Sequence, residues 1–189
     1  MVEGPGPAEP LDDSAWGQEM ADLDTTSGGW RAGLERWSRE QYRILMRHPW
    51  LERIRLMERA GTPSQIAALE SGLRALTGTG LTEHEKAQVL LILDGYIFWE
   101  GRLASDVAQG AMERGVRVEA AVQAFGALLR QVIDPDRFPA LHRAAQAGFF
   151  EIAQDPSAEF EFGLGMVLDG VGSLIRRRSQ GSRRQRRAS

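Results

Sequence analysis

Residues 82–108 read TEHEKAQVLLILDGYIFWEGRLASDVA, and this stretch constrains the fold more than any other. Thr82 followed three positions later by Glu85 is typical of a capping box, so we predict one helix from Thr82 to about Ala108. The helix is apolar on two sides, one carrying Val89, Ile92, Leu93, Tyr96, Trp99 and Leu103, and the other carrying Leu91, Gly95 and Phe98. A helix that is apolar nearly all round has to be covered on both sides. In a domain of this size, we expect part of that cover to come from a second subunit.

A second helix of this kind is predicted near the C-terminus. Asp155 and Pro156 combine a capping residue with a residue suited to the first helical position. A continuous apolar stripe follows, made of Phe160, Leu164, Val167, Leu168, Val171, Leu174 and Ile175. A further face carries Phe162, Gly163, Met166 and Gly170. The small residues on that face would allow another helix to approach closely.

The other segments also show helical spacing rather than the alternation of strands. A helix is predicted from Trp30 to Arg47, because Pro49 disfavours helical geometry at His48. Thr62, Pro63 and Gln65 predict a capped helix start, with a capping box and an apolar stripe of Ile66, Leu69, Leu73 and Leu76. Further helices are expected over about 11–23, 50–57, 118–132 and 138–150. The prediction is a single all-α domain of about six to seven helices.

Composition sets the expected boundaries and shows an uneven charge distribution. Residues 1–29 are predicted to be a flexible segment with a remnant of a linker helix, 30–178 the folded domain, and 179–189 a disordered arginine-rich tail. Residues 176–189 hold seven arginines and no acid, whereas the rest of the chain holds 16 basic and 26 acidic residues. Such a tail is either a solvated end or a sequence-independent attraction for nucleic acid phosphates.

Several kinds of chemistry lack support in the sequence. The chain has no cysteine, and its three histidines, His48, His84 and His142, lie in neither Glu-x-x-His nor His-Glu-x-x-His spacing. No phosphate loop or dinucleotide fingerprint occurs, so we expect no enzyme, no cofactor and no metal site. The longest aliphatic run is Val89–Leu93, and no secretory signal is visible, so no membrane span and a cytoplasmic location are expected.

Four groups of residues stand in a characteristic order and spacing: Trp30–Arg31 with 48–51 (HPWL), Pro63 with 80–82 (GLT), 138–141 (FPAL), and 160–164 (FEFGL) continuing to 168–170 (LDG). Together they resemble the C-terminal regulatory domain of the tetracycline-repressor (TetR) family. The resemblance covers residues 30–178. It implies a two-fold symmetric homodimer, in which helices 82–108 and 156–177 form a four-helix bundle with their symmetry mates. The expected interface consists of Leu91, Gly95, Phe98, Phe162, Gly163, Met166 and Gly170.

The resemblance also implies a cavity for a small apolar or aromatic effector whose binding relieves repression of transcription. Helical-face reasoning, rather than a fixed family motif, selects its lining: Trp37, Gln41, Leu45, His48, Trp50, Ile54, Leu73, Tyr96 and Trp99. Core packing is the alternative for the aromatic residues in this set. Glu100, beside an apolar helix face, is a further candidate ligand contact unless it points to solvent.

One part of the family pattern is not found. Family members begin with a DNA-binding domain that contains a helix-turn-helix, but the 29 residues before Trp30 offer no recognition helix. Operator DNA is therefore an expected partner only if such a domain is restored. The alternatives are a misassigned or truncated start, or a module that heterodimerises, binds or carries small molecules without binding DNA.

Overall fold

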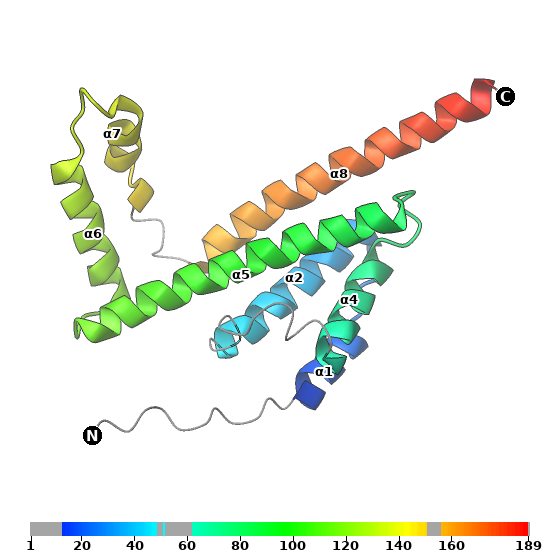
Figure 1. The fold of residues 1–189 in the computed structure, drawn as a ribbon, viewed down its shortest axis with the longest axis horizontal. Helices are drawn as coiled ribbons and strands as arrows, with labels where there is room; N and C mark the ends of the chain where they lie inside the picture. Colours follow the sequence, from blue (N-terminus) through cyan, green and yellow to red (C-terminus); the bar gives the residue numbers. More distant parts are fainter. Residues whose placement is uncertain (1–12, 49–50, 52–61, 151–155, 189) are drawn as a thin grey trace.

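The computed structural model describes residues 13–48, 51, 62–150 and 156–188, and over these residues the protein is all-helical. The helices are α1 (Asp13–Asp22), α2 (Gly29–Arg47), α4 (Pro63–Ala75), α5 (Glu83–Glu113), α6 (Val118–Val132), α7 (Pro139–Gln146) and α8 (Pro156–Ala188). In Figure 1, α5 and α8 run antiparallel across the molecule. α2 packs against both α5 and α8, α4 packs against α2 and α5, and α1 packs against α4. The pair α6–α7 stands at the end of α5. The expected all-α fold is confirmed.

The capping signals explain where the central helices begin. Both halves of the predicted capping box form at α5, since Glu85 N donates to Thr82 Oγ1 at 3.2 Å and Thr82 N donates to a Glu85 carboxylate oxygen at 2.9 Å. At α4, Gln65 N donates to Thr62 Oγ1 at 3.3 Å, but Gln65 Oε1 is buried with no hydrogen-bond partner among the described residues. The capping box predicted there is therefore only half formed.

The core lies where α2, α4, α5 and α8 meet. Trp37 and Leu34 of α2, Leu93 of α5, and Leu164 and Leu168 of α8 are all at most 1% exposed. α1 packs against α4, and its residue Met20 belongs to the same buried cluster. The short helix predicted over 50–57 lies outside the described residues except for Leu51, which is buried.

Only part of the apolar stripe predicted for α4 faces the core. Ile66 and Leu69 are 58% and 41% exposed, whereas Leu73 is half-buried against the core and Leu76, which follows α4, is fully buried as predicted. The buried positions within α4 are small or polar: Ser64, Gln65, Ala68, Ser71, Gly72 and Ala75. A Cβ placed on Gly72 would come within 3.0 Å of side-chain atoms of both Leu90 and Trp37. Because large side chains on α2 and α5 already fill this space, only a face of small residues fits against them.

Several helix ends also differ from the predicted ones. α5 runs five residues beyond Ala108, whereas α7 ends at Gln146, short of the predicted Phe150. α8 continues to Ala188, so residues 179–188, where composition predicted a disordered tail, are helical in the structure. Among the described residues, no helix is both long enough and apolar enough to cross a membrane.

Candidate functional site

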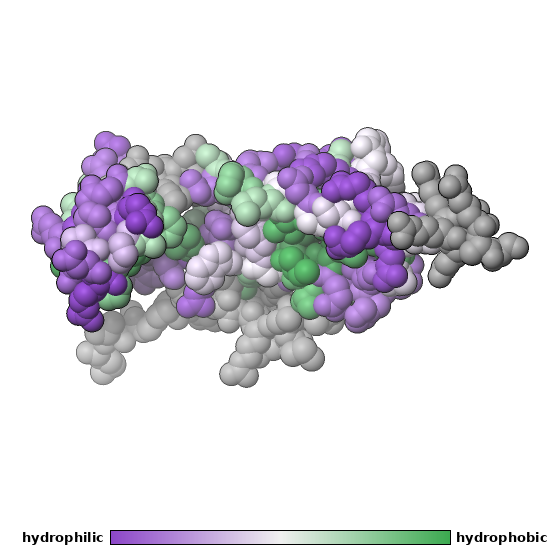
Figure 2. All heavy atoms as spheres, turned by 90° about the horizontal axis from the view of Figure 1, so that it is seen from above, coloured by the Kyte–Doolittle hydropathy of each residue, from purple (hydrophilic) through white to green (hydrophobic). Residues whose placement is uncertain are grey.

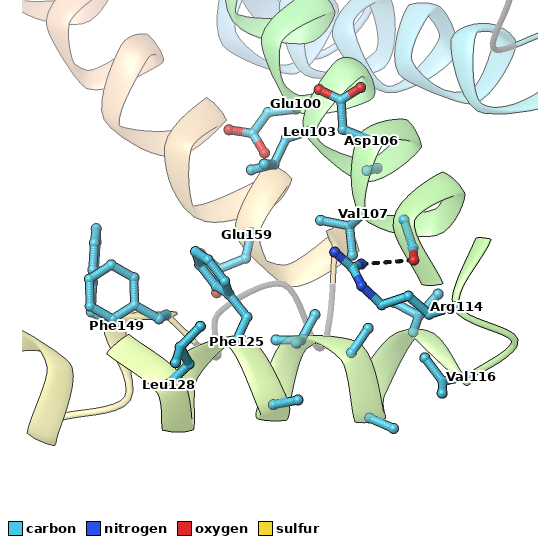
Figure 3. Close-up of a pocket in the computed structure, with 18 residues that line it drawn as sticks. Glu100, Leu103, Asp106, Val107, Arg114, Val116, Phe125, Leu128, Phe149 and Glu159 are labelled. Carbon is cyan, nitrogen blue, oxygen red and sulfur yellow. Dashed lines mark hydrogen bonds between the residues drawn. The ribbon is translucent and has the colours of Figure 1, made fainter. Parts of the chain in front are cut away.

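A groove of about 910 Å³ lies between the C-terminal half of α5 and α6. Figure 3 shows α6 along one side, α5 and the start of α8 along the other, and Phe149 at one end. Its lining is mainly apolar, and consists of Glu100, Leu103, Ala104, Asp106, Val107, Gly110, Arg114, Val116, Val118, Ala120, Ala121, Val122, Ala124, Phe125, Leu128, Phe149, Phe150 and Glu159. A groove of this size and character suits a drug-sized apolar molecule.

Aromatic rings form one end of the groove. Phe125 of α6 and Phe150 meet edge to face, with ring centroids 6.2 Å apart, and Phe149 and Phe150 meet at 5.0 Å. Phe125 and Leu128 are nevertheless 54% and 55% exposed. The rings are therefore positioned by one another and still present apolar surface that a further molecule could cover.

Charged groups lie at the α5 side of the groove. The pKa of Glu100 is raised, chiefly because burial penalises its charged form and also because Glu159 repels it. Arg114 donates to the carbonyl oxygen of Gly110 at 2.8 Å, so its guanidinium is held along α5. Across the described residues, no three metal-ligating side chains are close enough to hold an ion. The groove thus combines a mainly apolar lining with a few charged side chains.

Of the residues predicted for the ligand cavity, the seven that the structure describes do not line this groove. Trp37 and Leu45 are core residues, and the Trp37 indole N–H donates to Ala68 O at 2.7 Å. Gln41 is 5% exposed, and its amide nitrogen has no hydrogen-bond partner within the described part of the chain. His48 is an exposed residue at the end of α2, and Leu73 is half-buried on α4. Trp50 and Ile54 lie outside the described residues.

Tyr96 joins two helices. Its hydroxyl donates to Phe160 O at 2.9 Å, and its ring stacks on the Phe160 ring at a centroid distance of 5.7 Å. Burial is the main cause that raises the pKa of this hydroxyl, followed by the charge of Glu100. Trp99, one turn further along α5, is 63% exposed. Tyr96 therefore holds α5 to α8, and Trp99 faces outward.

Sequence reasoning identified parts of the groove but not the groove itself. Glu100, the candidate ligand contact, lines the groove, and so do Phe125 and Leu128 of the helix predicted over 118–132. The missing signal was the direction of α6, which leaves α5 after a turn at Gly115, where φ is +65°. A positive φ of this kind is readily adopted by glycine, but the sequence alone does not show where the next helix then points.

Comparison with known proteins identifies the family. The tetracyclin repressor-like C-terminal domain matches residues 24–175. The chain belongs to this family. A similar protein is the HTH-type transcriptional repressor DrrR1 of Streptomyces coeruleorubidus, which is 30% identical over 158 residues. That alignment covers 82% of this chain and 56% of the relative, so the chain spans just over half the length of the relative it matches.

In this repressor-like domain, the residues expected at a subunit interface fall into two groups. Leu91, Phe162 and Met166 are 53%, 70% and 63% exposed, and Gly95 and Gly170 are also exposed. Phe98, in contrast, is half-buried against the core. Gly163 lies against Tyr96 of the same chain, since a Cβ on Gly163 would be 2.3 Å from the Tyr96 hydroxyl oxygen.

The exposed group has further apolar neighbours on the same two helices. Ile92 and Trp99 are 58% and 63% exposed on α5. We refer to Leu91, Ile92, Trp99, Phe162 and Met166 as the α5–α8 outer face. Figure 2 shows one face of the molecule, on which hydrophobic residues gather near the middle between more hydrophilic areas. Apolar residues this large and this exposed are typical of a surface that meets another protein.

Proposed function

We propose that this chain is the effector-binding and dimerisation part of a TetR-family transcriptional repressor, with a small molecule relieving repression. The observation that carries the proposal is the family match over residues 24–175. The similarity to DrrR1, an HTH-type transcriptional repressor, supports it. In this family, operator contact is made by a separate helix-turn-helix domain, and the C-terminal domain matched over residues 24–175 does not include it. The proposal includes no catalytic step, and it places the protein in the cytoplasm, where a repressor reaches its operator.

The proposed homodimer forms through the α5–α8 outer face. These helices pack antiparallel against each other, and each buries one side in the core while leaving large apolar residues on the other. A two-fold axis would bring this face onto its own copy, so that four helices form a bundle. Gly95 and Gly170, both exposed, would allow the helices of the two subunits to approach closely.

The proposed effector is apolar or aromatic and occupies the groove between α5 and α6. The groove has the volume for such a molecule, whereas Trp37 and Leu45 are packed into the core. An effector bound there contacts both α5 and α6, so it would change the relative free energies of different orientations of α6 against α5. An effector shifts the protein between two states only as far as it binds one of them better. The groove therefore suits a signal that alters the orientation of α6.

The dimer is tested by light scattering on the purified chain. Wild type should have twice the mass of one chain, and the double variant Leu91→Asp, Phe162→Asp should have the mass of one. Two buried carboxylates facing their copies across an apolar interface are costly. The matched control is Glu83→Gln with Arg102→Gln, both exposed positions on α5. A monomeric wild type, or a double variant that stays dimeric, contradicts the proposed interface.

The regulatory proposal is tested by deleting the gene and measuring transcripts genome-wide. We expect a small set of transcripts, including genes beside the deleted one, to rise several-fold and to return when the gene is restored. A restored gene encoding the monomeric variant should leave them raised. Unchanged transcripts in the deletion strain would contradict repression and would favour a stand-alone binding or carrier role.

A further inference from the structure

We propose that the C-terminal end of α8 binds the phosphate backbone of duplex DNA without regard to sequence. α8 is one helix from Pro156 to Ala188, and its final turns extend past the start of α5 (Figure 1). Residues 176–187 include seven arginines and no acidic residue. The helix therefore carries a concentrated positive charge away from the body of the domain.

The register of this helix gathers most of these arginines on one side. Positions 176, 183 and 187 are separated by seven and four residues, and positions 177 and 184 are separated by seven. At 3.6 residues per turn, these five positions fall within a sector of about 120° around the helix axis. They define what we call the arginine stripe: 176, 177, 183, 184 and 187.

A sixth arginine has a different task. Arg178 donates from Nε to a Glu85 carboxylate oxygen at 2.7 Å, which ties α8 to the first turn of α5. This hydrogen bond is the leading cause that lowers the pKa of Glu85, with the backbone N–H of Thr82 as the next. Arg178 thus fixes the point from which the basic end departs and leaves the stripe positions on another side of the helix.

The length and the positive charge of the arginine stripe are suited to binding duplex DNA. From 176 to 187 the helix rises by roughly 16 Å, and duplex DNA presents about ten negative charges over such a span. Arginine also suits phosphate, because its planar guanidinium donates several hydrogen bonds in a fixed geometry. The body, with 16 basic and 26 acidic residues, offers no comparable net attraction. The choice of DNA over other polyanions rests on the proposed repressor function.

The test is fluorescence anisotropy with a labelled random-sequence duplex of about 30 base pairs, titrated with the full chain at several salt concentrations. If five arginines contact phosphates, affinity should fall roughly 500-fold between 50 and 200 mM salt. The triple variant Arg183→Gln, Arg184→Gln, Arg187→Gln leaves two such contacts and should show only about a 12-fold fall over that range. Its affinity at the lower salt concentration should also be weaker than that of wild type.

Matched variants separate position from overall charge. Arg117→Gln, Arg137→Gln and Arg143→Gln remove the same number of charges from exposed positions on the body, and this control should keep the wild-type salt dependence. Replacing the arginines at positions 183, 184 and 187 by lysine should also keep most of the salt dependence of DNA binding, because the charges remain. Equal salt slopes for the two glutamine triples would overturn the proposal. So would binding to phosphatidylglycerol-containing vesicles that the labelled duplex fails to compete away.

The duplex contains no operator, so this experiment and the transcript measurement can fail separately. Loss of DNA binding in the tail variant together with unchanged transcripts would leave the basic helix as a DNA contact and remove the repressor role. Raised transcripts together with equal salt slopes would support the repressor role and exclude the basic helix as a DNA contact.

Discussion

Replacing Gly163 by alanine should destabilise the protein, although alanine is the better helix former. A Cβ at this position would lie 2.3, 2.7 and 2.8 Å from Oη, Cζ and Cε2 of Tyr96. The ring cannot move freely, because its hydroxyl donates to Phe160 O and its face stacks on the Phe160 ring. The substitution must therefore displace Tyr96, the residue that joins α5 to α8.

The magnitude follows from opposing effects. Overpacking costs about 1–3 kcal/mol, and loss of the Tyr96 hydrogen bond costs about 1 kcal/mol more. The higher helix propensity of alanine stabilises the folded state by about 1 kcal/mol relative to glycine. Gly163→Ala should thus lower the free energy of unfolding by about 1–3 kcal/mol. Gly165→Ala is the matched control, because a Cβ there meets nothing within 4 Å on the same helix, and it should be neutral or stabilising.

The assay is urea unfolding followed by circular dichroism, with all variants compared at the same two protein concentrations, because the proposed dimer would contribute to stability. A double-mutant cycle with Tyr96→Ala tests the cause, since most of the cost of Gly163→Ala should disappear once the ring is absent. Equal unfolding free energies for Gly163→Ala and Gly165→Ala would refute the reasoning. A cost that persists without Tyr96 and depends on protein concentration would instead place Gly163 at the subunit interface.

Three further substitutions follow from the same structure. Trp37→Ala removes a side chain that is 1% exposed, so unfolding should become easier by about 3–5 kcal/mol, measured by thermal denaturation against the wild type. Thr82→Ala removes the acceptor for Glu85 N, which is one half of the capping box, and should lower the free energy of unfolding in urea by about 1 kcal/mol. Thr82→Ser should keep the wild-type stability, because serine supplies the same acceptor. Glu161→Gln breaks an exposed pair with Arg39 at 2.6 Å and should cost about 0.2–1 kcal/mol near neutral pH, less at high salt. Because Arg39 lowers the pKa of Glu161 in the folded state, this contribution is present above the ordinary carboxyl pKa and is lost as the pH falls through the lowered value; an effect that grows in acid would contradict the pair.

The elements of this fold were more predictable than their contacts. Thr82 with Glu85, and Thr62 with Pro63, predicted the starts of α5 and α4 because capping is local chemistry. The burial of α4 was not predictable in this way, because its small-residue face fits a space set by Trp37 on another helix. Hydrophobic spacing alone selects the largest residues, and two of those selected on α4, Ile66 and Leu69, are exposed.

The same limit applies to the candidate site. Tyr96 and Trp99 were placed on one side of their helix by spacing, yet one contacts α8 and the other faces outward. The groove depends on the angle between α5 and α6 and on Phe150, which follows α7 in the chain and meets the Phe125 ring edge to face. Hydrophobic periodicity reports which face of one helix is apolar, and it does not report the angle between two helices.

The pair α6–α7 follows α5 and precedes α8 in the chain but stands at the end of α5 in space, and this position has an evolutionary consequence. Their main contacts are with α5 and with each other, while α5 and α8 pack on each other directly. Changes of sequence or length within residues 115–150 can therefore accumulate with little effect on the core that α2, α4, α5 and α8 share. New chemical preferences in the proposed effector groove can therefore arise in this segment while the packing of α2, α4, α5 and α8 is kept.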